Sequence, residues 1–127
     1  MKIVFLEDNL DLLFLFKTLA RRHFGAEVFC YKNVTDFMSN PKVVLSADLM
    51  FLDVNLGPCE LNGIDAYKWL QDEGYLGKIY FLTGHAKSHP LVQQATQFGS
   101  VVLQKPLEIN TLTLILADSQ SAKGSGF

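Results

Sequence analysis

Short apolar runs alternate with longer segments of mixed polarity along the chain of 127 residues. Four of the runs are almost continuously apolar, which is typical of strands in a parallel sheet that helices cover on both faces. A fifth and shorter apolar run, at residues 27–30, completes the alternation of strand and helix signals. From these runs and the turn residues around them, we predict strands at residues 2–6, 27–30, 49–53, 78–82 and 101–104.

The segments between the predicted strands carry the start and stop signals of helices. Asn9, Asn33 and Ser88 are candidate N-cap residues, because their side-chain oxygens can accept hydrogen bonds from the first backbone N–H groups of a helix. Glycine or proline stands where the first four helices are expected to end, at positions 25, 41, 74 and 99. We predict helices at residues 9–23, 33–39, 64–73, 88–99 and 107–119.

The last predicted helix has a less favourable composition than the others. It contains several β-branched residues, which are poor helix formers. Apolar side chains at positions 109, 112, 115 and 116 nevertheless share one helical face, and the alternation of elements also favours a helix here. We expect this face to be buried, whereas Leu114 is expected to be exposed and available to a partner.

The strict alternation of strand and helix with short connections predicts an α/β fold, with one doubly wound parallel sheet of five strands and five helices. This domain is expected to span residues 1–120. Residues 121–127 are small and polar, which is typical of a tail or the start of a linker. Because Met1 directly precedes the first strand, we expect the natural polypeptide to begin here.

The composition narrows the classes of function. A net charge of −2 without a basic stripe argues against direct contact with nucleic acid. Glu7, Asp8 and Asp11 interrupt the N-terminal apolar segment, so we expect neither a signal peptide nor a membrane span there. Cys30 lies in an apolar run and is expected to be a small core residue, whereas Cys59 lies in a loop where a redox role is conceivable. These features together predict a cytoplasmic protein without membrane contact.

Polar residues stand where four of the predicted strands end. Glu7 and Asp8 follow the first strand, Asp53 closes the third, Thr83 follows the fourth and Lys105 follows the fifth. The carboxyl ends of parallel strands share one edge of the sheet, where ligands bind, so we expect these side chains to lie close together. Carboxylates gathered at such an edge would suit a hard cation such as Mg²⁺.

Asp53 is a candidate nucleophile, because a carboxylate can attack a phosphoryl group to give an aspartyl phosphate. The Lys105 ammonium could neutralise one phosphoryl oxygen, the Thr83 hydroxyl could bond another, and Gly84 would leave the approach open. Each residue alone also has an ordinary structural explanation: a solvated loop or helix cap for the acidic pair, a loop cap for the aspartate, an exposed lysine before a turn. Their joint spacing favours a phosphoryl-accepting pocket.

With this spacing, residues 2–119 resemble the receiver domain of two-component response regulators, the CheY-like family. The resemblance implies a (βα)5 flavodoxin-like sheet with strand order 2-1-3-4-5. It also implies a Mg²⁺ site formed by Glu7, Asp8, Asp53 and the backbone carbonyl of Asn55.

The same resemblance assigns roles and partners. Asp53 would accept a phosphoryl group from a histidine kinase or a phosphotransfer protein, and the domain would then act on a downstream protein effector. Thr83 matches the switch residue of the family. Lys105 matches its phosphate-contacting lysine, which usually precedes a cis proline, here Pro106. Such a domain is a signalling module of a phosphorelay that catalyses only its own phosphorylation and dephosphorylation, not an enzyme acting on other substrates.

Three features depart from the family pattern. The loop at residues 54–63 is slightly longer than usual. The family usually has an aromatic residue three positions before the lysine, and here that residue is Val102; Phe98 is a nearby aromatic that could substitute, or the output could use another face. His85, two positions after the switch residue, occupies a place that together with Asn55 tends to tune hydrolysis of the acyl phosphate, although a solvated loop histidine is the simpler interpretation.

Two other interpretations of the residues stay open. A pseudo-receiver would use the same fold as a phosphorylation-independent interaction module, but such proteins usually lose the acidic pair, the aspartate or the lysine, and all are present here. A haloacid-dehalogenase-type phosphohydrolase would also place an aspartate after a buried strand. That family needs a second aspartate at the position of Asn55, and a longer chain for its cap insertions.

Overall fold

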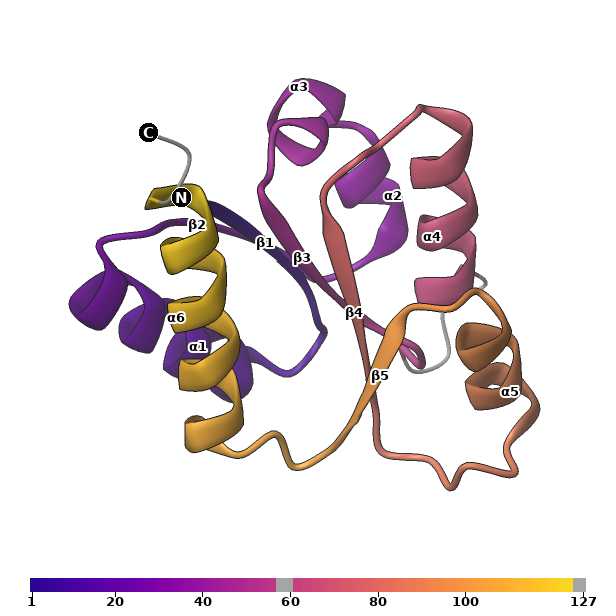
Figure 1. Ribbon diagram of the computed structural model, residues 1–127. Coiled ribbons are helices and arrows are strands. Elements are labelled where there is room, and N and C mark those ends of the chain that lie inside the picture. Colours follow the sequence, from indigo (N-terminus) through magenta and orange to yellow (C-terminus); the bar gives the residue numbers. More distant parts are fainter. Residues whose placement is uncertain (57–60, 125–127) are drawn as a thin grey trace.

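The computed structural model describes residues 1–56 and 61–124, with side chains as far as residue 120. Five strands form one parallel sheet in the order β2-β1-β3-β4-β5 (Figure 1). The predicted fold class and strand order are therefore confirmed. The strands are β1 (Lys2–Leu6), β2 (Glu27–Tyr31), β3 (Leu49–Asp53), β4 (Lys78–Thr83) and β5 (Val101–Gln104).

The described residues form six helices, one more than predicted. They are α1 (Leu10–Phe24), α2 (Val34–Met38), α3 (Pro41–Leu45), α4 (Gly63–Asp72), α5 (Pro90–Gln97) and α6 (Ile109–Gly124). The additional helix is α3. Pro41 was expected only to end the preceding helix, but it also begins the next one. The fixed φ angle of proline and its missing N–H suit the first position of a helix.

Helices cover both faces of the sheet, with α1 and α6 on one face and α2, α4 and α5 on the other (Figure 1). Successive side chains of a strand point to opposite faces. Ile3 and Phe5 therefore belong to the core beneath α1 and α6, whereas Val4 and Leu6 belong to the core on the opposite face. This burial on both faces explains why the two central strands β1 and β3 are almost continuously apolar.

The single tryptophan of the chain, Trp69, lies on α4 and packs, partly buried, against the core that contains Val4 and Leu6. Its ring meets the ring of Phe37 on α2 edge to face, with centroids 5.7 Å apart. Phe37 is fully buried and also meets Tyr31 on β2 edge to face. The tryptophan thus reports on the packing of α2 against α4.

Two of the three predicted N-caps are confirmed. The side chain of Asn9 accepts hydrogen bonds from the backbone N–H groups of Asp11 and Leu12 at the start of α1. Asn33 caps α2 in the same way by accepting the N–H of Asp36 at 2.8 Å. These caps fix where the chain turns from strand into helix.

The third predicted cap, Ser88, is wrong. The N-cap of α5 is His89, whose Nδ1 accepts the backbone N–H of Leu91 at 3.2 Å. Pro90 occupies the first position of the helix. The residue before a proline favours an extended conformation, and His89 has this conformation with φ −63° and ψ 135°, so the helix begins at Pro90.

The buried face of α6 is partly as predicted. Leu112 and Leu116 are buried and Leu114 is 71% exposed, as expected, but Ile109 is 51% exposed. Ile109 lies in the first turn, because the helix begins two residues later than predicted, and the helix continues to Gly124 instead of ending at residue 119. None of the helices in the described ranges has the length and apolar character needed to cross a bilayer.

The register of the sheet decides which strand ends meet. Leu6 pairs with Leu52, so Glu7 lies level with Asp53 on neighbouring strands. Thr83 pairs with Gln104 at the end of β4, and the next residue, Lys105, donates its backbone N–H to the carbonyl of Thr83. The sheet therefore brings the polar ends of four strands to one edge.

Candidate functional site

Three polar side chains are buried at this edge of the sheet. Glu7 and Thr83 are fully buried, and Asp53 is 2% exposed. Burying a carboxylate is costly unless a partner compensates its charge. The local structure must therefore supply partners to both acidic groups.

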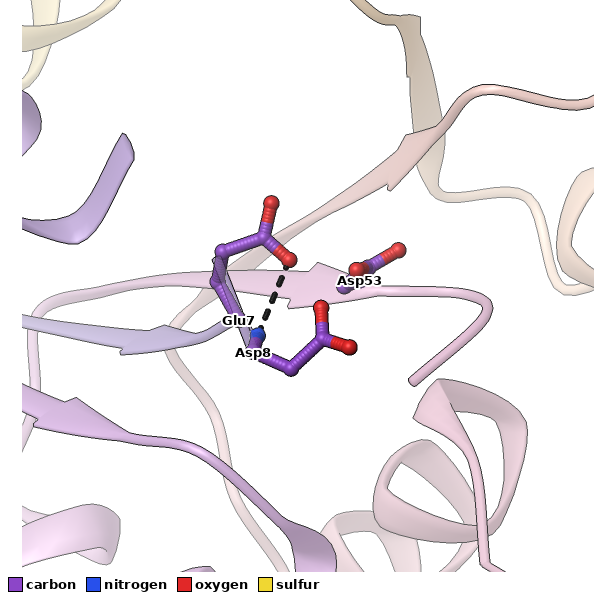
Figure 2. A group of neighbouring side chains, drawn as sticks. All are labelled: Glu7, Asp8 and Asp53. Atoms are coloured by element: carbon purple, nitrogen blue, oxygen red, sulfur yellow. Dashed lines mark hydrogen bonds between the residues drawn. The ribbon is translucent and has the colours of Figure 1, made fainter. Parts of the chain in front are cut away.

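Glu7, Asp8 and Asp53 form an acidic cluster, which Figure 2 shows from close by. One carboxylate oxygen from each residue lies within 4.8 Å of the others. Asp8 is exposed, so the cluster opens toward solvent on its side. A small divalent cation needs oxygen ligands and retains several waters, and this donor set with an open side fits such a cation.

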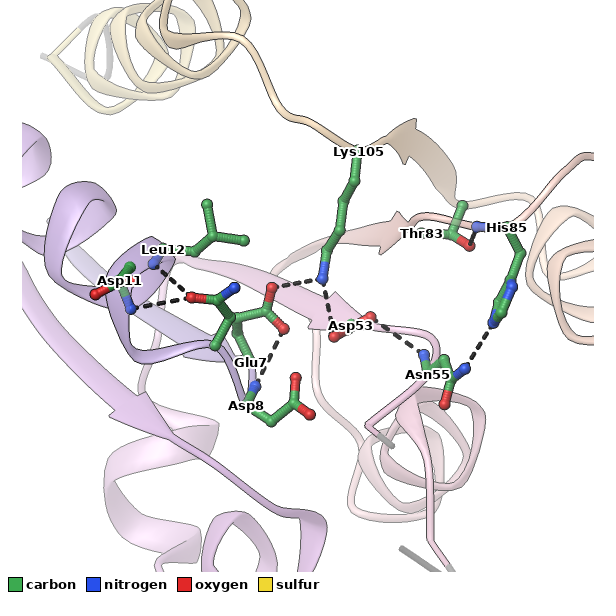
Figure 3. A network of polar contacts seen from close by, with 10 residues as sticks. Glu7, Asp8, Asp11, Leu12, Asp53, Asn55, Thr83, His85 and Lys105 are labelled. Atoms are coloured by element: carbon green, nitrogen blue, oxygen red, sulfur yellow. Dashed lines mark hydrogen bonds and ion pairs between the residues drawn. The ribbon is translucent and has the colours of Figure 1, made fainter. Parts of the chain in front are cut away.

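Lys105 compensates the two buried carboxylates. Its Nζ lies 2.5 Å from Glu7 Oε1 and 3.0 Å from Asp53 Oδ2 (Figure 3). Burial alone would lower the pKa of Lys105, but the hydrogen bonds to both carboxylates and their charges outweigh burial and raise it. The lysine therefore stays charged at the centre of the site.

Glu7 has a shifted pKa, raised to about 7. Burial is the largest cause, and the neighbouring carboxyl of Asp53 adds to it, whereas Lys105 acts in the opposite direction. Three carboxylates face one ammonium group in the acidic cluster, so the site has an excess of negative charge. A bound divalent cation would remove this excess.

Asp53 is held at both oxygens. Oδ2 accepts from Lys105, and Oδ1 accepts the backbone N–H of Asn55 at 3.1 Å. The start of α4 also presses against the end of β3, because a Cβ on Gly63 would lie 2.3 Å from the backbone oxygen of Asp53. Only glycine permits this close approach, which brings the start of α4 against the backbone of the aspartate.

The remaining predicted residues lie beside Asp53. Thr83 Oγ1 accepts the backbone N–H of His85 at 3.0 Å, and His85 Nε2 lies 2.6 Å from Asn55 Nδ2 (Figure 3). The predicted ligand role of the Asn55 carbonyl stays a prediction. The peptide bond between Lys105 and Pro106 is cis, as the family resemblance implied.

Sequence analysis missed three residues around the site. Gly63 follows an asparagine, a pair that marks a turn, but its close approach to β3 has no local signal. Gln104 donates to the His85 carbonyl at 2.7 Å, and the rings of His85 and His89 stack. No spacing in the sequence indicates these tertiary contacts.

Cys30 lies on β2 and is not among the residues of the described site. It is a free, partly buried cysteine, and burial raises the pKa of its thiol. This agrees with the predicted role as a small core residue, because a thiol is less reactive when its pKa is high. Cys59, for which a redox role was considered, lies outside the described residues.

The fold and the site together define a class of protein: a doubly wound α/β domain with an acidic cluster at the carboxyl edge of its sheet, whose oxygens fit a divalent cation. The family model of the response regulator receiver domain matches residues 3–117. The chain therefore belongs to the response regulator receiver family. Receiver domains are signalling modules of two-component systems, and they typically bind Mg²⁺ and carry phosphoaspartate.

Solved structures of receiver domains share the fold. A response regulator receiver domain from Clostridium thermocellum is 22% identical, with a TM-score of 0.78 and coverage of 97% of this chain and 96% of that one. The chemotaxis protein CheY4 from Vibrio cholerae is 20% identical, with a TM-score of 0.74 and coverage of 93% and 97%.

The N-terminal domain of an uncharacterized protein from Wolinella succinogenes is 20% identical, with a TM-score of 0.85 and coverage of 100% of this chain and 99% of that one. A search of curated protein sequences found no match. At these identities the structural likeness shows the fold, and the site must be judged from its own residues.

Proposed function

We propose that this chain is a phosphoryl-accepting receiver of a phosphorelay. It takes a phosphoryl group on Asp53 from a histidine kinase or a phosphotransfer protein in the cytoplasm, and it then switches a surface that binds a downstream protein effector. The observation that carries this proposal is a buried Asp53 that belongs to the acidic cluster and lies 3.0 Å from the ammonium of Lys105. No nucleic acid or membrane contact is part of the proposal.

Mg²⁺ bound by Glu7, Asp8, Asp53 and the backbone carbonyl of Asn55 would neutralise charge on the phosphoryl oxygens. The backbone N–H of Asn55 and the Lys105 ammonium orient the carboxylate of Asp53 through its two oxygens. One of these oxygens attacks phosphorus, and the bond from phosphorus to the donor imidazole nitrogen breaks. The products are an acyl phosphate on Asp53 and a free histidine on the donor.

Lys105 and Thr83 would then hold the phosphoryl group. The ammonium already lies beside Asp53, so it needs only a small movement to pair with a phosphoryl oxygen. The Thr83 hydroxyl accepts the His85 N–H through a lone pair, and its own proton would be donated to another phosphoryl oxygen. As the hydroxyl rotates toward that oxygen, it releases the His85 N–H. This second movement provides the switch.

Intact mass measurement after incubation with acetyl phosphate tests the proposal. We expect one phosphoryl adduct that requires Mg²⁺, is lost in EDTA and is absent in Asp53→Asn. Asp72→Asn, which changes an exposed aspartate at the end of α4, is the matched control and should label like wild type. Binding of beryllofluoride, which mimics a phosphoryl group on a carboxylate, detects a working site even when hydrolysis is fast.

A phosphorylation-independent pseudo-receiver is the second candidate. It is favoured by Val102, a short side chain at the position where the family usually has an aromatic switch residue. This candidate predicts neither an adduct nor beryllofluoride binding, and partner binding that Asp53→Asn leaves unchanged. The same two assays therefore decide between the candidates.

A further inference from the structure

A groove of about 570 Å³ lies between α5 and β5. Val92, Gln93 and Gln97 line it from α5, and Val102 and Gln104 line it from β5. Val102 is too short to connect this groove to the phosphoryl site in the way that a large aromatic side chain could. The structure offers a different physical connection, which passes through His85.

The backbone of His85 joins the site to one wall of the groove. Its N–H donates to Thr83 Oγ1 at 3.0 Å, and its carbonyl accepts the side-chain amide of Gln104 at 2.7 Å. Thr83 is a fully buried site residue, whereas Gln104 lines the groove from β5. A shift of the His85 backbone therefore changes both contacts together.

The ring of His85 joins the site to the other wall. Its Nε2 lies 2.6 Å from Asn55 Nδ2, beside Asp53 (Figure 3). The same ring stacks on His89, with centroids 4.1 Å apart and an angle of 12° between the planes. His89 is the N-cap of α5 and bonds the N–H of Leu91, so the stack ends at the first turn of the helix that forms this wall.

We propose that His85 is the relay between the phosphoryl site and the groove between α5 and β5, through the Gln104 contact on one wall and the His89 stack on the other. This inference rests on the proposed function, because it needs a phosphoryl group on Asp53. When the Thr83 hydroxyl turns to that group, the His85 N–H loses its acceptor and the loop moves. The two contacts convey this movement to opposite walls, so the groove has two states that site occupancy biases.

The side-chain amides of Gln93, Gln97 and Gln104 are natural reporters of the groove in ¹H–¹⁵N NMR spectra. We expect all three to shift when Mg²⁺ and beryllofluoride are added to wild type. His89→Asn keeps a capping side chain but removes the stacked ring. In this variant the shift changes of the Gln93 and Gln97 amides on adding beryllofluoride should be at least about threefold smaller than in wild type. The shift change of the Gln104 amide should stay as in wild type.

The complementary variant is Gln104→Ala, which should leave the shifts of Gln93 and Gln97 as in wild type. His23→Asn, an exposed histidine on α1, is the matched control and should respond like wild type. ¹⁹F signals of bound beryllofluoride are recorded in every sample, and we expect them in wild type and all three variants. Amide dispersion confirms that each variant is folded.

The outcomes separate the relay from the proposed function. If wild type gives no bound ¹⁹F signal, the phosphoryl-accepting function fails and the relay fails with it. If the signal is present but the groove amides do not shift, only the relay is overturned. Shifts of Gln93 and Gln97 that stay full-sized in His89→Asn would also overturn it, because the stack would then carry no coupling.

Discussion

The carboxylate of Glu7 is fully buried, and its nearest partner is the ammonium of Lys105. A proton on Glu7 removes the cost of burying its charge, which explains the raised pKa. In the unfolded chain this carboxyl has its ordinary pKa of 4.5, whereas in the folded chain the pKa is about 7. The folded state therefore binds the proton more tightly than the unfolded state between these two values.

This difference predicts how stability depends on pH without metal. The contribution of Glu7 to the free energy of unfolding is fully present below about pH 4.5 and falls as pH rises toward about 7. In EDTA, Glu7→Gln should reduce the loss of stability between pH 5 and pH 7.5 by about 1–3 kcal/mol. Urea unfolding at both pH values measures this change in the free energy of unfolding, and Glu27→Gln, at an exposed position, is the control. Equal pH slopes in Glu7→Gln and wild type would refute this assignment.

The ammonium of Lys105 contacts both buried carboxylates and is expected to contact a phosphoryl group on Asp53 as well. Loss of a charge-assisted hydrogen bond costs about 1.5–3 kcal/mol, so Lys105→Ala should weaken beryllofluoride binding at least about tenfold. Lys68→Ala, an exposed lysine on α4, should bind like wild type. Titration followed by ¹⁹F NMR gives both affinities, and an unchanged affinity in Lys105→Ala would exclude a phosphate-contacting role.

Among the elements, the start of α4 packs closely against the end of β3. A Cβ on Gly63 would lie 2.3 Å from the backbone oxygen of Asp53, whereas a Cβ on Gly84 would meet no atom within 4 Å. Gly63→Ala should therefore lower the free energy of unfolding by about 1–3 kcal/mol, because the backbone at the site must move. Gly84→Ala is the matched stability control, and it should stay within about 0.5 kcal/mol of wild type. Denaturant unfolding of the two variants compares them directly.

The elements that could be predicted from the sequence are those whose signals lie in neighbouring residues of the chain. The apolar runs identified all five strands, and Asn9 and Asn33 marked two helix starts because a cap acts on residues next to it in the chain. The prolines were harder to interpret, because Pro41 follows α2 and also begins α3, whereas Pro90 as the first helical residue makes His89 the cap. The resulting errors were a missed α3 and the wrong cap for α5.

The acidic cluster and Lys105 could be predicted because parallel topology alone brings strand ends to one edge. The contacts of His85 could not, because stacking on His89 and the bond from Gln104 depend on loop geometry that no residue pattern specifies. For the same reason the close approach of Gly63 to Asp53 appears only in the folded structure.

For the whole molecule, a cation that binds only the folded state should stabilise it by mass action. At Mg²⁺ concentrations about one hundred times the dissociation constant, the free energy of unfolding should rise by about 2.7 kcal/mol. Trp69 packs against Phe37 between α2 and α4, so its fluorescence follows unfolding. The gain should be much smaller in Asp53→Asn, whereas the exposed Asp72→Asn should keep it. If Mg²⁺ raised the free energy of unfolding equally in wild type and in both variants, the cation would bind at a site without Asp53.

The contact between Glu7 and Lys105 joins residues 98 positions apart in the chain. Glu7 directly follows β1, whereas Lys105 directly follows β5, which pairs with β4 at the edge of the sheet. The carboxylate therefore has its ammonium partner only after β5 has joined the sheet. During synthesis on the ribosome, the N-terminal strands therefore carry an uncompensated acidic group until the fifth strand emerges. Closing such a long loop is slow, so the site proposed to accept a phosphoryl group should be completed late in synthesis.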